Sequence, residues 1–150
     1  SPWLRLSTEP RAIGLLFARA AKIIAPDWVR NSKLDINYLS HDKKVIEQYE
    51  DDPLIHRQIT PALFFNAKKA GERAIKEVRQ IQVPVLLMHG SDDKITSYKA
   101  SQELMQNANN NKVDIRFIPW EGLYHELHHE TEKDRVFDAI LDWMNEKSKN

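Results

Sequence analysis

The chain has 150 residues, and its 22 basic and 22 acidic side chains balance to a formal charge of zero. This length suits one compact domain, and the balanced charge lacks the basic surface of nucleic-acid-binding domains, so nucleic acid is not an expected partner. With 41% hydrophobic and 29% charged residues, the composition is that of a folded protein. The absence of cysteine excludes disulfides and cysteine-ligated metals, and it suits a cytoplasmic location.

Residues 1–9 begin without methionine and show no signal-peptide pattern. Their pattern is typical of a segment that directly follows a strand. We therefore expect residues 1–9 to leave a core strand that belongs to a preceding part of a longer protein.

Residues 10–82 follow a helical pattern. The segment 13–24, IGLLFARAAKII, is apolar except for Arg19 and Lys22, which share one narrow stripe that we expect to be solvated. Such a helix must be buried on several sides, or face lipid or an apolar ligand. Pro26 predicts its end.

Two further helices are predicted in this region. Residues 41–50 carry apolar side chains at one-face spacing. The pair Thr60-Pro61 is a typical helix start, and the helix should run over 62–81, with a break possible at Gly71. We expect residues 10–82 to form a helical cap.

The pattern changes between residues 80 and 84. Residues 83–88, VPVLLM, are predicted to form a strand buried on both faces, followed by a helix over 97–108 and an asparagine-rich turn at 107–111. Residues 113–119 alternate and predict a second strand that Pro119 stops.

A last helix is predicted after a capping-box pattern at Thr131, with its apolar stripe over 136–144. Strand, helix, strand and helix in this order imply a parallel crossover of the α/β class. Two parallel strands do not make a stable sheet alone, so residues 83–150 are predicted to be the end of a larger doubly wound sheet.

Functional groups in open α/β sheets lie beyond the carboxyl ends of the strands. This rule selects Asp92 and Asp93 after the first strand, and the loop 121–125 with its His125 after the second. An aspartate that accepts from Nδ1 of a histidine leaves Nε2 free to take a proton from a serine. Asp93 and His125 follow the chain order Ser, Asp, His of α/β-hydrolase triads.

Three segments carry a family resemblance. Residues 83–96, VPVLLMHGSDDKIT, and 117–144, FIPWEGLYHELHHETEKDRVFDAILDWM, closely resemble the C-terminal end of monoacylglycerol lipases and lysophospholipases of the α/β-hydrolase superfamily. Residues 39–60 resemble the LSRD…Y..DPL.H segment of the family's cap. The HG-x-x-D motif of the family places its acid at Asp93, and the G-x-Y-H-E-L motif places its catalytic histidine at His125.

The resemblance implies a serine ester hydrolase without a cofactor or metal, acting on lipid-like esters. The family's serine lies in a G-x-S-x-G elbow. No two of the four glycines bracket a serine in this way. The resemblance thus implies the cap, last two strands and terminal helix of such an enzyme, and a 150-residue piece that is inactive alone.

Other interpretations of these residues stay open. Asp93 could merely cap a helix or close a turn, His125 could be a surface histidine, and His89 is expected to pack and hydrogen-bond locally. His125 to His129 also match HExxH, a zinc motif with Glu126 as base, although the surrounding turn signals predict a loop and a third ligand such as Glu146 would be needed.

The apolar cap allows two interpretations. Its side chains either form a core against the sheet or cover an acyl chain, and a membrane-facing lid would give peripheral access to lipid. A different class of function also stays open, in which the chain is a non-catalytic interaction module. An orphaned sheet exposes a strand edge and an apolar face, which favour self-association.

Overall fold

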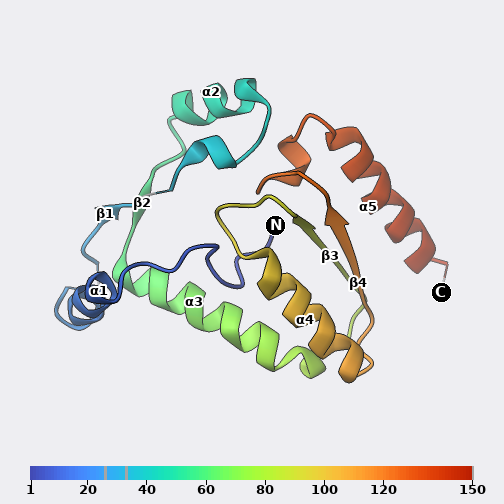
Figure 1. Ribbon diagram of the computed structural model, residues 1–150, viewed down its shortest axis with the longest axis horizontal. Coiled ribbons are helices and arrows are strands. Elements are labelled where there is room, and N and C mark those ends of the chain that lie inside the picture. The colour runs from blue at the N-terminus through green and yellow to red at the C-terminus, as the bar shows by residue number, and fades with distance from the viewer. Residues whose placement is uncertain (26, 33, 150) are drawn as a thin grey trace.

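The structure is a computed structural model that describes residues 1–25, 27–32 and 34–149. Its helices and strands follow one another along the chain as drawn in Figure 1. The α-helices are α1 (Ala12–Ile24), α2 (Lys43–Asp51), α3 (Pro61–Lys76), α4 (Tyr98–Asn110) and α5 (Lys133–Lys147). The strands are β1 (Arg30–Asn31), β2 (Gln58–Ile59), β3 (Val85–Gly90) and β4 (Ile115–Trp120), and the short 3-10 helices are η1 (Ile36–Tyr38), η2 (Val78–Gln80) and η3 (Leu127–His129).

The predicted α/β class is confirmed by the parallel pair of β3 and β4, which α4 connects. The register runs from Val85 opposite Ile115 to Gly90 opposite Trp120. Both strands therefore end at the same edge of the sheet, and the loops that follow them start side by side.

Alternate residues of these strands enter two separate cores, because successive side chains of a strand point to opposite faces. Leu87 and Ile115 belong to the core under α4, whereas Met88 and Trp120 belong to the core under α5. The two helices thus cover opposite faces of the sheet (Figure 1). The remaining buried members of the first core are Leu4, Ile75, Val78, Ala100, Leu104 and Ala108, and those of the second are Leu123, Leu127 and Val136.

Pro119 does not stop the second strand, contrary to the prediction. It lies inside β4, opposite His89. The backbone carbonyl of Trp120 accepts from the N–H of Ser91 at 2.8 Å, so the backbone of Trp120 faces β3. Backbone groups of successive strand residues face opposite sides, so the backbone nitrogen of Pro119 points away from β3. A proline is tolerated there because the N–H that it lacks would have had no partner in β3.

The ends of three predicted elements also differ. The first strand begins at Val85 rather than at residue 83, and α4 runs on to Asn110, through much of the segment predicted as a turn. Ser97 caps α4, with its Oγ accepting from the N–H of Ala100 at 3.2 Å. The capping box predicted at Thr131 does not form, since α5 begins at Lys133 without a side-chain cap.

In the predicted cap region, α3 starts as expected. Thr60 Oγ1 accepts from the N–H of Leu63 at 3.1 Å, and Pro61 is the first helical residue. The helix does not break at Gly71. A Cβ on this glycine would lie 2.0 Å from the carbonyl oxygen of Leu4, so the missing side chain allows the N-terminal segment to cross the helix closely.

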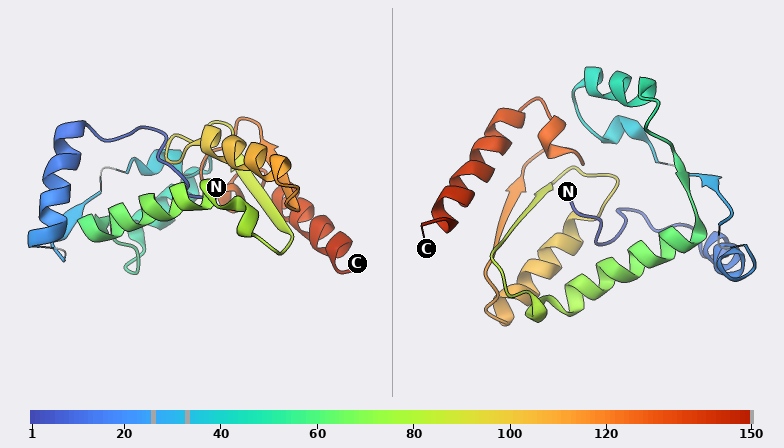
Figure 2. Two further views of the ribbon diagram at one scale, coloured as in Figure 1. Left: turned by 90° about the horizontal axis from the view of Figure 1, so that it is seen from below. Right: turned by 180° about the vertical axis from the view of Figure 1, so that it is seen from behind.

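Helix α1 packs against α3 at the end of the molecule opposite α5 (Figure 2). None of its residues is buried, and Phe17 and Ile24 are 70% and 83% exposed. Lys22, expected on a solvated stripe, is instead half-buried on the side of α3, where its Nζ donates to Asn66 Oδ1 at 3.2 Å. Of the two alternatives predicted for α1, burial on several sides is therefore wrong for contacts within the described chain, because only Leu15, Ala18, Ala21 and Lys22 of this helix are half-buried. The other alternative, that α1 faces lipid or an apolar ligand, stays a prediction.

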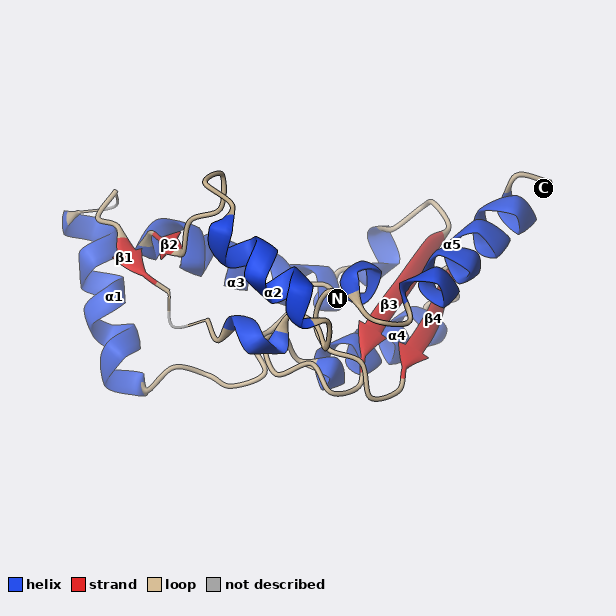
Figure 3. Ribbon diagram, turned by 90° about the horizontal axis from the view of Figure 1, so that it is seen from above, coloured by secondary structure: helices blue, strands red, loops and turns tan. Residues whose placement is uncertain are grey.

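The end of α1 at Ile24 agrees with the prediction, but Pro26 itself lies outside the described residues. Strands β1 and β2 form a small antiparallel pair that was not predicted, and Figure 3 shows it next to α1 and away from β3 and β4. Among the described residues, no helix combines the length and apolar character needed to cross a membrane. The division into residues 1–9, 10–82 and 83–150 stays a prediction.

Candidate active site

Asp93 lies in the turn that follows β3. Its backbone N–H donates to the carbonyl of Gly90 at 3.2 Å, and its Oδ1 accepts from the N–H groups of Ile95 and Thr96 at 2.7 and 2.9 Å. Three hydrogen bonds within residues 90–96 therefore fix the turn and the direction of its carboxylate. The side chain is fully buried, and its second oxygen, Oδ2, points toward the loop that follows β4.

His125 lies in that second loop, and its Nδ1 is 2.8 Å from Oδ2 of Asp93. The two loops can approach so closely because Gly90 has no side chain. A Cβ on Gly90 would lie 2.2 and 2.3 Å from the carbonyl oxygens of Leu123 and Tyr124. The structure thus brings together the two residues predicted from the strand ends.

Two more side chains complete the surroundings of Asp93. Thr96 Oγ1 donates to Oδ2 at 2.8 Å and lies 3.2 Å from His125 Nδ1, and His89 Nε2 lies 3.1 Å from Oδ2. His89 is fully buried, and its Nδ1 lies 2.7 Å from Ser101 Oγ. His89 therefore packs and hydrogen-bonds locally, as predicted, but its partner is the candidate catalytic aspartate.

The charge of Asp93 is stabilised by these contacts. Burial alone would raise the pKa of Asp93, but hydrogen bonds from the side chains of His125 and His89 and from the backbone of Thr96 outweigh burial and lower it well below its usual range. The carboxylate is thus ionised and faces Nδ1 of His125. An ionised carboxylate only accepts, so the proton of His125 is held on Nδ1 and Nε2 is left as an acceptor.

The neighbouring Asp92 differs from Asp93 in its exposure and in its partner. Its side chain is 56% exposed, and the nearest cation is Lys94, 3.9 Å away. The choice of Asp93 over Asp92 for the contact with His125 is therefore settled by geometry, whereas the catalytic role of Asp93 and His125 stays a prediction. Sequence reasoning missed Thr96, although a hydroxyl three residues after an acid in a turn is a recognisable pattern of local capping.

The HExxH interpretation requires His125 and His129 to lie one turn apart on an α-helix. The structure instead places a 3-10 helix at Leu127–His129 after a loop, and His125 is turned toward Asp93. The predicted third ligand, Glu146, forms an ion pair with Arg116 at 2.7 Å. The described residues therefore do not form the site that this motif predicts.

A different group in this loop could hold a metal ion. Ligand atoms of Glu126, His128 and His129 lie within 4.8 Å of one another, and both histidines are exposed. Although His128 is exposed, partial desolvation of its ring, together with the neighbouring His129, lowers the pKa of His128. Glu126 Oε2 and His129 Nδ1 are already in contact at 2.6 Å, so the group forms an internal hydrogen bond without any ion.

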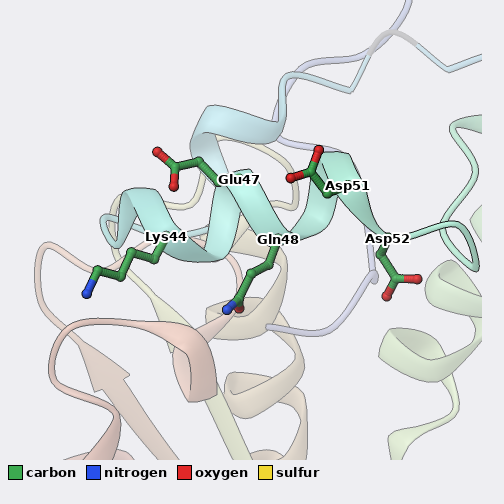
Figure 4. A pocket seen from close by; sticks show the side chains of 5 residues that line it. All are labelled: Lys44, Glu47, Gln48, Asp51 and Asp52. Carbon is green, nitrogen blue, oxygen red and sulfur yellow. The ribbon is translucent and has the colours of Figure 1, made fainter.

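The surface of the described residues includes two hollows. One runs along α2 and is polar (Figure 4), and none of its lining residues belongs to the site of Asp93 and His125. These lining residues are Lys44, Glu47, Gln48, Asp51 and Asp52. The other is largely apolar and lies between β3 and α5, lined by residues that include Met88, His128 and Phe137. This apolar hollow reaches the loop of His125 at Leu127 and His128.

Comparison with known proteins agrees with this geometry. Residues 1–132 match the Hydrolase_4 family, described as serine aminopeptidase, S33. The crystal structure of a monoacylglycerol lipase from Paleococcus ferrophilus superposes with a TM-score of 0.86 at 30% identity, over 95% of this chain and 55% of that one. Phospholipase YtpA of Bacillus subtilis is 30% identical over 93% of this chain and 53% of its own length.

The human monoglyceride lipase is 29% identical over 89% of this chain and 44% of its own length. The chain thus spans about half the length of these relatives, and it spans 16% and 40% of two others, from Dictyostelium discoideum and Schizosaccharomyces pombe.

Proposed function

Because the chain belongs to the Hydrolase_4 family of α/β-hydrolases, we propose that it contributes the aspartate and histidine of a Ser-Asp-His triad in a carboxylic ester hydrolase. The observation that carries this proposal is the 2.8 Å contact between the ionised Asp93 and Nδ1 of His125. The serine would be supplied by a part of the enzyme outside these 150 residues, so the chain alone is expected to be inactive.

In the intact enzyme, Nε2 of His125 takes the proton of the serine hydroxyl as its oxygen attacks the ester carbonyl. The imidazolium that forms is stabilised by Asp93. The histidine then returns the proton to the leaving alcohol, and an acyl-enzyme remains. Water repeats the sequence, with His125 as base again, and releases the fatty acid together with free serine.

The proposed substrates are monoacylglycerols or lysophospholipids. Relatives are named as monoglyceride lipases and as a phospholipase, which supports a lipid-like ester. The exposed apolar side of α1, with Leu16, Phe17 and Ile24, suits a lid over an acyl chain or a peripheral contact with a membrane. The proposal thus includes α1 as a lid over the acyl chain and as a contact with the membrane.

The substitution His125→Ala in the intact, serine-containing enzyme tests the proposal. Hydrolysis of monooleoylglycerol and of lysophosphatidylcholine should fall by at least about 10³-fold, since the general base is lost. His56→Ala is the matched control, because His56 is exposed and lies outside the site. Near-normal turnover of the His125 variant would refute the assignment.

A fluorophosphonate that reacts with activated serines gives a second test. The 150-residue chain should remain unlabelled, because none of its serines is expected to be the nucleophile. Stoichiometric labelling of this chain would contradict the proposal that the serine lies elsewhere.

The interaction module remains a second candidate because of β3. In the part of the chain that the structure describes, β3 pairs with β4 alone, and the apolar hollow between β3 and α5 borders the same strand. An unpaired edge beside apolar surface favours strand addition or self-association. Sedimentation equilibrium at high protein concentration decides this point, and a clean monomer would count against the module.

A further inference from the structure

Glu130 is a fully buried carboxylate that the proposed mechanism does not use. It follows η3, five residues after His125, and is 1% exposed. Burying a carboxylate is costly unless its oxygens are hydrogen-bonded. Here Oε1 accepts from the N–H of Tyr124 at 2.7 Å, and Oε2 accepts from the N–H of His41 at 3.0 Å.

These two donors come from segments that are far apart in the sequence. Tyr124 directly precedes the candidate catalytic histidine, whereas His41 lies between η1 and α2 in the predicted cap. The His41 ring adds a third contact, with Nδ1 3.0 and 3.1 Å from the two oxygens of Glu130. The same ring stacks on Tyr124 with centroids 3.7 Å apart. Glu130 therefore joins the cap to the histidine loop at one point.

Further hydrogen bonds extend this junction in both directions. The N–H groups of His125 and Glu126 donate to the carbonyls of Tyr38 and Leu39 at 3.3 and 2.8 Å. Ser40 Oγ donates to the carbonyl of His129 at 2.8 Å. Residues 38–41 thus lie along residues 124–130 and hold their backbone, with the Glu130 carboxylate at the centre.

We propose that Glu130 is a positioning residue for His125, which makes the placement of the catalytic imidazole depend on docking of the cap segment 38–41. This inference rests on the proposed function. The Tyr124 N–H belongs to the peptide unit just before Tyr124, and holding it on Glu130 orients the backbone from which the His125 ring reaches Asp93. If residues 38–41 move away, Glu130 keeps one of its two backbone donors and the loop loses its support.

The substitution Glu130→Gln separates this role from simple filling of space. The amide has nearly the same volume, and its oxygen can accept from either Tyr124 or His41. Its NH₂ group must then face the other backbone N–H, so one of the two bonds is lost. Glu132→Gln is the matched control, because Glu132 is an exposed residue of the same loop that pairs with Arg135.

A second variant keeps the test valid if Glu130→Gln does not fold. His41→Phe preserves the backbone N–H and the aromatic stacking on Tyr124 and removes the ring contact with Glu130. The ring of His41 is 41% exposed, so the substitution should be tolerated. Its effect should have the same direction as that of Glu130→Gln and be smaller.

The experiment measures steady-state ester hydrolysis and amide hydrogen exchange in the intact, serine-containing enzyme. We expect Glu130→Gln to lower kcat by about 10-fold to 100-fold with KM changed less than about threefold, because displacement of a catalytic group by about 1 Å has effects of this size. Exchange should become faster at the amides of Tyr124, His125 and His41. Glu132→Gln should leave both measurements unchanged.

Two results would overturn the inference. A folded Glu130→Gln enzyme with normal kcat would show that Glu130 does not position His125, and so would unchanged exchange at Tyr124 and His41. An inactive wild-type enzyme would instead refute the proposed function. In that case the exchange at Tyr124 and His41 still decides whether Glu130 holds the loop.

Discussion

The substitution Asp93→Asn is the sharpest chemical test of the site, because the structure dictates how the new amide must lie. Oδ1 of Asp93 accepts from two backbone N–H groups, those of Ile95 and Thr96. The asparagine must place its own oxygen there, so its NH₂ group replaces Oδ2. That NH₂ then lies about where Oδ2 stood, 2.8 Å from Nδ1 of His125.

A donor at this point reverses the tautomer of His125. Nδ1 must become the acceptor, so the proton moves to Nε2, which can no longer take the proton of the serine. In serine hydrolases with a triad, this change lowers kcat by about 10⁴-fold. At about 1.36 kcal/mol for each factor of ten, the loss corresponds to about 5 kcal/mol of transition-state stabilisation.

The assay is the initial rate of ester hydrolysis by the intact enzyme at neutral pH, with the rate of fluorophosphonate labelling as a second measure. Asp92→Asn is the control, since Asp92 is exposed and only distantly paired. It should retain the wild-type rate. A folded Asp93→Asn enzyme within about tenfold of the wild-type rate would refute the reasoning, because a reversed tautomer is expected to cost far more.

Three further predictions concern stability and membranes. Gly71→Ala should lower the free energy of unfolding by about 1–3 kcal/mol in urea melts, because the new Cβ meets the backbone of Leu4. Gly14→Ala, with open space around it, should leave the free energy of unfolding unchanged or raise it by up to about 1 kcal/mol. Equal effects of the two substitutions would contradict this prediction. The lowered pKa of Asp93 means that the stability its charge contributes is complete above about pH 4 and is lost only as the pH falls toward the lowered value. The difference in unfolding free energy between wild type and Asp93→Asn should therefore be constant near neutrality and shrink only in strong acid, and shrinkage already near pH 6 would be inconsistent with it. Phe17→Ser should weaken flotation of the protein with phosphatidylcholine vesicles by about 10-fold or more without changing its melting temperature, since a buried phenyl contributes about 1.5–3 kcal/mol; unchanged flotation would argue against membrane contact through α1.

The sequence predicted the parts of the structure that depend on local patterns. A continuous apolar run and an alternating one, joined by a helix, indicated the parallel pair of β3 and β4. The rule that functional groups follow the carboxyl ends of strands then selected Asp93 and His125. Both follow strands that are hydrogen-bonded neighbours, and this is why 32 residues of separation in sequence become 2.8 Å in space.

What the sequence did not predict depends on contacts between distant segments. Glu130 and His41 are 89 residues apart, and no local pattern distinguishes a buried glutamate from the exposed ones around it. The same holds for α1, whose apolar pattern predicted either burial or contact with lipid or an apolar ligand, and which packs against α3 with most of its residues exposed. Pro119 was misjudged for a related reason, since its tolerance depends on which edge of β4 faces β3.

The two oxygens of Asp93 have different roles, since Oδ1 fixes the carboxylate in its turn and Oδ2 faces His125. Oδ1 is held by backbone N–H groups of its own turn, so its position does not depend on any side chain. Oδ2 contacts Thr96 of the same turn, His89 of β3 and His125 of the loop that follows β4. The carboxylate is thus held by its own turn and strand, so the accuracy of the pair depends on the loop that carries His125. This loop is the one held by Glu130. Asp93 therefore supports the ring of His125, and Glu130 supports the backbone that carries this ring.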